Sequence, residues 1–381
     1  MLKHSSRWLV VTILSLSLLT VMAGAAVAPA LGSIRNYFSS ASPMTVQLVV
    51  SMPALFIILT SLCFPLVCRY MGSRTIALAG LVLYVCAGAG AFLCNGIGML
   101  LVLRALLGVA VGLLLPLATG LLAYYFPPAR MAQLMGLSAF MNQMGGVIAT
   151  LLAGMLCAIS WRYAFLVYLG GVFAMVLVLV FLPNEHLPRR EQGESATALL
   201  RRFHAPVTGM LLLMLIFFIF PTHFAITAMG LGLDLPTTTC LMVGLDLVAA
   251  LAGLCFGTAM KRLGRAVKYI SPLCLLAGMA CLSMAQGMGL LAAGCVWIGI
   301  GNGIGVPYIN TIAGLRAGSG ATTSVMPMLS AALNAGQFVS PLVVTPLASM
   351  LFGAANLHAA YIVGVFFALL FLLQTFATRK F

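Results

Sequence analysis

A single carboxyl inside a long apolar stretch is the side chain best suited to proton chemistry. Asp246 lies about eight residues into the stretch 238–260, and it is the one acidic residue that we expect within such a stretch. An ionisable side chain in an apolar surrounding is costly and usually functional, and burial favours the neutral acid over the carboxylate. Asp246 could therefore bind and release a proton near neutral pH. The alternative is a carboxyl at a water-filled mouth, satisfied by the backbone or by a nearby hydroxyl.

Two further ionisable side chains lie in apolar stretches. Arg104 cannot lose its charge, and burying it costs roughly 2.5–3.5 kcal/mol on membrane-insertion scales. It could lock its helix to another helix or bind an anion, and the sequence leaves both roles open. His223, which follows Pro221 closely, could titrate in the physiological range, although a lone helical histidine is more often a packing residue. Asp246, His223 and Arg104 are our candidate proton-coupling residues.

Several amides and one phenol also fall near the middle of apolar stretches. Amides at such depth must pair with each other, with water or with a ligand. We expect them to face a substrate cavity, and the alternative is that they hold helices together. With Arg104, the candidate cavity residues are Asn142, Gln143, Asn302, Tyr308, Asn310, Asn334 and Gln337.

The composition predicts that these residues lie in membrane-spanning helices. Of the 381 residues, 63% are hydrophobic and 6% are charged, whereas a soluble domain carries roughly a quarter charged residues. So much apolar surface needs lipid as its solvent, and each spanning helix takes about 20 residues. We expect an all-α membrane protein with twelve spans, at 8–36, 46–68, 75–94, 98–125, 131–157, 162–182, 206–232, 238–260, 266–287, 289–313, 323–351 and 358–378.

The basic residues predict the orientation of these spans. All Lys and Arg residues except Arg35, Arg104 and Arg162 fall on one side of the expected helices, together with both termini. By the positive-inside rule this side is cytoplasmic, in the inner membrane. The net charge of +14 therefore reports orientation, and no basic face for nucleic acid is present.

The chain also repeats itself. At an offset of 192 residues Asn142 matches Asn334 and Gly72 matches Gly264, and at an offset of 191 Gly108 and Gly112 match Gly299 and Gly303. Many transporters place a substrate site between two such repeats. We expect two pseudo-symmetric six-helix bundles, residues 1–182 and 206–381, joined by a polar cytoplasmic linker, residues 183–205.

Three motifs resemble the major facilitator superfamily. Arg104-x-x-x-Gly108-x-x-x-Gly112 is similar to a signature of its fourth helix, and the stretch from Trp161 to Phe165 is typical of its sixth. The stretches 65–74 and 257–265 resemble its loop Gly-x-Leu-Ala-Asp-Arg-x-Gly-Arg-Arg, with basic residues in place of the usual Asp. The resemblance implies two six-helix bundles around a central cavity, most like the drug and metabolite efflux branch. It also implies a conformational loop at Arg69, Gly72, Arg74, Lys261, Gly264 and Arg265.

Two functions fit these observations. The first is proton-coupled efflux of a small organic solute by alternating access, in which the proton and the solute compete. The second is a symporter or uniporter that imports a small metabolite or organic anion, with Arg104 gripping a carboxylate. An enzyme is not expected, because no hydrolase or metalloprotease motif is present. We expect no cofactor and no metal, and we expect protons, a small solute and the lipid bilayer as partners of a monomer.

Overall fold

The computed structural model describes residues 7–126, 128–186, 201–353 and 356–378, and every regular element in these ranges is a helix. The backbone explains this, because lipid offers no water to satisfy exposed N–H and C=O groups, and a helix satisfies them within itself. The structure divides into two compact units, residues 1–41 with 49–190 and residues 42–48 with 191–381. Most of the expected linker, at 187–200, lies outside the described residues.

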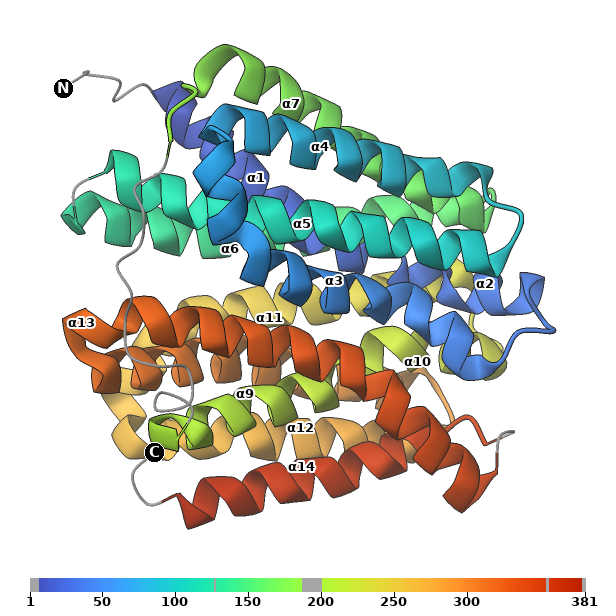
Figure 1. The fold of residues 1–381 in the computed structure, drawn as a ribbon. Helices are drawn as coiled ribbons and strands as arrows, with labels where there is room; N and C mark the ends of the chain where they lie inside the picture. Colours follow the sequence, from blue (N-terminus) through green and yellow to red (C-terminus); the bar gives the residue numbers. More distant parts are fainter. Residues whose placement is uncertain (1–6, 127, 187–200, 354–355, 379–381) are drawn as a thin grey trace. The chain divides into compact units, whose positions relative to one another are not determined.

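The first unit holds the helices of the N-terminal part of the chain (Figure 1). Its helix α3 carries two internal prolines, Pro53 and Pro65, and the first residues of α3 belong to the second unit. The elements are α1 (Arg7–Ala25), η1 (Ala28–Ala30), α2 (Leu31–Tyr37), α3 (Pro43–Tyr70), α4 (Ser73–Gly90), η2 (Ala91–Leu93), α5 (Ile97–Tyr125), α6 (Pro128–Cys157), η3 (Trp161–Leu169) and α7 (Gly170–Phe181).

The second unit holds the remaining helices. Its helix α11 ends at Leu263, and the next residue, Gly264, has a φ of +52°, which suits glycine because no Cβ crowds the backbone there. The elements are α9 (His204–Phe217), α10 (Ile219–Gly230), α11 (Leu235–Leu263), η4 (Gly264–Ala266), α12 (Val267–Ser283), α13 (Met288–Phe352) and α14 (Ala359–Ala377).

The expected membrane fold is confirmed. In the described part of the chain, 11 helical segments are long and apolar enough to span a membrane, and α12 is a shorter apolar helix. Together they correspond to the twelve expected stretches. The segment Trp161–Phe181 combines η3 and α7, and the segment His204–Gly230 combines α9 and α10.

One expected break between spans is missing from the helix assignment. The sequence predicts a loop between 313 and 323, but α13 runs unbroken from Met288 to Phe352. It contains two candidate spans, Met288–Gly314 and Met328–Phe352, and Figure 1 draws α13 as two passes that meet at one end. A straight helix of 65 residues would be about 98 Å long, so the chain reverses direction between the two spans, where the sequence predicts a connection.

The same close helix approach occurs once in each unit. A Cβ at Gly112 of α5 would lie 2.7 Å from Thr60 Cβ of α3, and a Cβ at Gly303 of α13 would lie 2.9 Å from Ala252 Cβ of α11. Gly108 and Gly299, one turn earlier, meet the same two partner helices. Small residues allow membrane helices to approach closely. The four glycines matched by the sequence repeat therefore perform the same packing in both units.

Candidate functional site

Arg104 lies at the centre of the first unit and is only 1% exposed. Its Nε donates to the Val49 carbonyl at 2.8 Å, Nη1 donates to the Tyr168 hydroxyl at 2.7 Å, and Nη2 donates to the Ala23 carbonyl at 2.5 Å. None of its hydrogen-bond partners is acidic. Each of the three nitrogens of the guanidinium thus has one acceptor in the protein, and these bonds join α5 to α1, α3 and η3.

Tyr168 completes this arrangement, and the sequence analysis did not identify it. Its hydroxyl donates to the Ala23 carbonyl at 2.9 Å while accepting from Arg104. Its ring packs edge-on to Tyr84, with centroids 5.5 Å apart. A Cβ at Gly88 would lie 2.6 Å from Tyr168 Cβ, so a glycine is needed where α4 passes the ring. The one feature of the sequence that could have pointed to Tyr168 is its position three residues after the motif Trp161–Phe165.

His223 of α10 lies in a polar cluster of the second unit, in contact with one side chain of α3 and one of α13. Its Nε2 is 2.9 Å from Gln47 Nε2 and 3.5 Å from Thr345 Oγ1. Its Nδ1 is 3.0 Å from Thr222 Oγ1 and 3.2 Å from the Ile219 carbonyl. Gln47 and Thr345 are themselves buried.

The cluster fits a neutral imidazole whose proton is on Nδ1. Nδ1–H then donates within α10, and Nε2 accepts from the Gln47 amide. The other end of that amide, Oε1, accepts from the Thr345 hydroxyl. A second ring proton would set an N–H donor against the amide N–H, so the Gln47 amide would have to turn or separate.

Asp246 is half-buried on α11. Its carboxyl is close enough to the Cys295 thiol of α13 for the two groups to interact electrostatically. Cys295 itself is 3% exposed. Asp246 therefore lies on a helix that packs against α13 and interacts electrostatically with a buried thiol of α13.

The candidate cavity residues do not form one cluster in either unit. In the first unit Asn142 accepts a hydrogen bond from Thr20 of α1 at 3.2 Å, and Gln143 is half-buried beside it on α6. In the second unit Asn334 donates to the Ser330 carbonyl of its own helix at 2.8 Å. Gln337 donates to Met214 Sδ of α9 at 3.9 Å.

The polar residues of the first pass of α13 differ in environment. Asn302 has a buried Oδ1 with no hydrogen-bond donor among the described residues. Asn310 is half-buried, and Tyr308, 6% exposed, lines a hollow with residues of α9, α12 and α14. The sequence alone placed all three on one helix but could not say that they face different neighbours.

The predicted conformational loop of the first unit binds the start of the linker. Ser73 N donates to the Glu185 carbonyl at 2.8 Å and Ser73 Oγ donates to the Pro183 carbonyl at 3.0 Å, while Arg74 donates to the Leu179 carbonyl. A Cβ at Gly72 would meet the Asn184 side chain. Arg69 is exposed, with its guanidinium 5.7 Å from the Tyr70 ring.

Its counterpart in the second unit is the turn at Gly264. Lys261, on the last turn of α11, is exposed, and the side chain of Arg265 lies outside the described residues. Within the described ranges no group of three His, Cys, Asp or Glu side chains could hold a metal ion.

Two units of span-length apolar helices, each with a few polar side chains among its helices, define a polytopic membrane protein. Residues 13–341 match the family model of the Major Facilitator Superfamily, so the chain belongs to that family. It is a transporter rather than an enzyme.

Solved structures agree on the fold. A bacterial homologue of the human lysosomal transporter Spinster is 16% identical, with a TM-score of 0.80, 100% of this chain and 98% of that chain covered. The nucleoside transporter NupG is 13% identical, with a TM-score of 0.78, 97% of this chain and 100% of that chain covered. A D-xylose-proton symporter is 15% identical, with a TM-score of 0.76 and 96% of both chains covered. No curated protein matches the sequence.

Proposed function

We propose that this transporter exports a small organic solute across the inner membrane in exchange for protons. The observation that carries the proposal is the presence of two titratable side chains, His223 and Asp246, within the candidate spans of one unit. Each of them changes charge where water is scarce, so its protonation state alters the free energy of the surrounding helices. We further propose that the protein works as a monomer with both termini in the cytoplasm.

Coupling requires that the proton favours one state of the transporter and the solute another. Asp246 faces Cys295 of α13, and the His223 cluster links α10 to α13 and to the start of α3. Protonation of either residue therefore changes the charge beside α13. A proton that stabilises one arrangement of these helices can drive alternating access, provided that the solute prefers the other arrangement.

Arg104 has a different role in this proposal. Each of its three nitrogens has a protein acceptor, Val49, Tyr168 or Ala23, and the side chain is 1% exposed, so a substrate carboxylate could reach it only if the packed helices around it separated. We propose that Arg104 holds the first unit together. This removes the specific feature that supported import of an organic anion.

Proteoliposomes loaded with a pH-sensitive dye test the coupling. Candidate organic solutes are added one at a time under an imposed pH gradient, and a transported solute is recognised by the proton flux that it causes. We expect Asp246→Asn to abolish this flux while solute binding, measured by thermal shift, persists. Equal proton flux in the wild type and in Asp246→Asn would refute the assigned role.

The direction of transport needs a separate measurement in intact cells. An exporter lets its solute accumulate in the cells when a protonophore is added. A symporter, the alternative function, loses accumulation under the same treatment, and a uniporter shows no change. Either of the last two outcomes would replace efflux by import or facilitated diffusion.

A further inference from the structure

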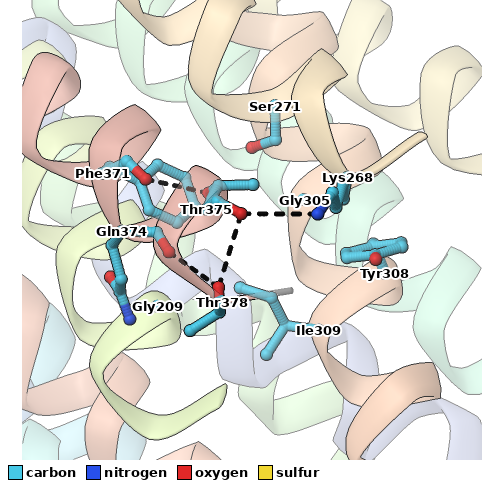
Figure 2. Close-up of a pocket in the computed structure, with 10 residues that line it drawn as sticks. All are labelled: Gly209, Lys268, Ser271, Gly305, Tyr308, Ile309, Phe371, Gln374, Thr375 and Thr378. Atoms are coloured by element: carbon cyan, nitrogen blue, oxygen red, sulfur yellow. Dashed lines mark hydrogen bonds between the residues drawn. The ribbon is translucent and has the colours of Figure 1, made fainter. Parts of the chain in front are cut away.

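A hollow in the second unit lies apart from both titratable residues. It is open to the surroundings, and the space between its walls is about 20 Å³, room for about one water molecule or one oxygen of a larger ligand. Figure 2 shows that its walls come from four helices, α9, α12, α13 and α14. The lining residues are Gly209, Lys268, Ser271, Gly305, Tyr308, Ile309, Phe371, Gln374, Thr375 and Thr378.

Most polar groups of this hollow are already used within the protein. Ser271 donates to the Gly301 carbonyl at 2.8 Å, and Thr375 donates to the Phe371 carbonyl at 2.8 Å. Thr378 donates to the Gln374 carbonyl at 2.7 Å. The amide nitrogen of Gln374 donates outside the hollow, to Thr208 and to the Ala205 carbonyl. These groups can therefore offer little to a ligand.

Two donors remain available. Lys268 Nζ makes one long contact of 3.5 Å to the Thr375 carbonyl and lies 4.8 Å from the Tyr269 ring centroid, and no carboxylate in the described ranges pairs with it. The Tyr308 hydroxyl has no hydrogen-bond partner in the same part of the chain. The charge of Arg316 acts on this hydroxyl as well. The hollow thus presents two donors, the ammonium of Lys268 and the phenol of Tyr308.

The depth of the hollow indicates where its ligand comes from. Lys268 is the second residue of α12, and Thr378 directly follows α14. Tyr308 lies 20 residues after the start of α13, which is roughly 30 Å of helix, or one hydrocarbon thickness. All three therefore lie at the end of their spans, at the level of lipid head groups, on the side that carries most basic residues.

We propose that this hollow binds the oxyanion of a phosphate ester, held by Lys268 and Tyr308. Basic pockets between spanning helices on the cytoplasmic side suit anionic lipid head groups, and a phosphate monoester dissolved in the cytoplasm offers the same oxygens. The site lies within one unit and is independent of the proposed proton coupling. An occupied site would join α12, α13 and α14 at their ends.

The test compares three conditions for the full-length protein. It is placed in nanodiscs of neutral phosphatidylcholine, in nanodiscs that also contain phosphatidylglycerol, and in neutral nanodiscs with glycerol 3-phosphate in the buffer. Acetylation of each lysine is followed by mass spectrometry. We expect phosphatidylglycerol to slow acetylation of Lys268 several-fold more than that of Lys261, an exposed lysine on the same side. Slowing by glycerol 3-phosphate alone would assign the site to a soluble phosphate ester.

Variants then separate binding from general surface charge. Loss of a charge-assisted hydrogen bond should weaken phosphatidylglycerol binding about tenfold in Lys268→Gln, whereas Lys261→Gln should bind as the wild type does. Tyr308→Phe should abolish the selective protection of Lys268, a readout that does not depend on the folding of the Lys268 variant. If Lys268 is protected no more than Lys261 in any condition, the site does not exist.

Discussion

Buried polar residues in this transporter differ in whether their hydrogen bonds are complete. Arg104 has three protein acceptors and is 1% exposed, whereas the amide that pairs with His223 would have to turn or separate if the ring gained a proton. In an apolar interior an unmatched donor or acceptor costs about 1–3 kcal/mol. The hydrogen-bond partners of a buried ionisable side chain therefore indicate, better than its burial does, whether its role is structural or depends on protonation.

Arg104→Gln should destabilise the first unit. The change removes the Arg104 donor from the Val49 carbonyl, from the Tyr168 hydroxyl and from the Ala23 carbonyl, which keeps its bond from Tyr168. We expect this to cost about 2–3 kcal/mol and to lower the unfolding temperature in detergent. Tyr168→Phe, which removes one hydroxyl, should cost about 1 kcal/mol. If Arg104→Gln instead keeps its thermal stability and loses solute affinity, the arginine binds substrate.

His223→Gln should change the pH dependence of transport rather than its maximum. A glutamine can keep a hydrogen bond to Gln47 but cannot gain a proton, so the part of the profile that reports the imidazole should disappear. On the basic side of the profile, transport should remain within about twofold of the wild type. An unaltered profile would leave Asp246 as the sole coupling group.

At the scale of the helices, the spacing of the glycines determines which helices pack closely. Gly108 and Gly112 set α5 against α3, and Gly299 and Gly303 set α13 against α11. In lipid, helices gain little by hiding apolar surface from each other, so close packing contributes most of the attraction. The glycines that repeat in the sequence therefore make equivalent helix contacts in the two units.

Gly303→Ala should disturb this contact. The added Cβ would lie 2.9 Å from Ala252 Cβ and closer still to the Ala249 carbonyl oxygen, and overpacking of this kind costs about 1–3 kcal/mol. Gly289→Ala, in the same helix with nothing within 4 Å of its Cβ, is the matched control. Thermal unfolding of both variants should show a loss in the first only.

The sequence predicts some of these features and misses others for physical reasons. Span positions follow from hydropathy, because every spanning helix must be apolar, and the small residues of the repeat point to close packing. The partners of Arg104 could not be predicted, since Tyr168 lies 64 residues away and two partners are backbone carbonyls. Faces of helices that are apolar all round give no periodicity, so the split between Asn302, Tyr308 and Asn310 was invisible.

At the scale of the whole molecule, the distribution of charge predicts the topology. The sequence predicts that both termini and the polar segment at 183–205 lie on the side with most Lys and Arg residues, and by the positive-inside rule we propose that this side is cytoplasmic. An even number of spans is required for this arrangement. The number of spans is worth testing, because two of the expected spans lie within the single element α13.

Sided proteolysis measures the topology directly. Protease-recognition sequences are inserted after Gly193 and after Phe381, and in a third variant after Asn95, in the turn between η2 and α5. The first two should be cleaved in inverted vesicles alone, since their sites lie on the basic side. The third should be cleaved in right-side-out vesicles alone. Cleavage of the Gly193 and Phe381 variants on opposite sides would mean an odd number of spans between them, and the repeat could not then form two bundles of six.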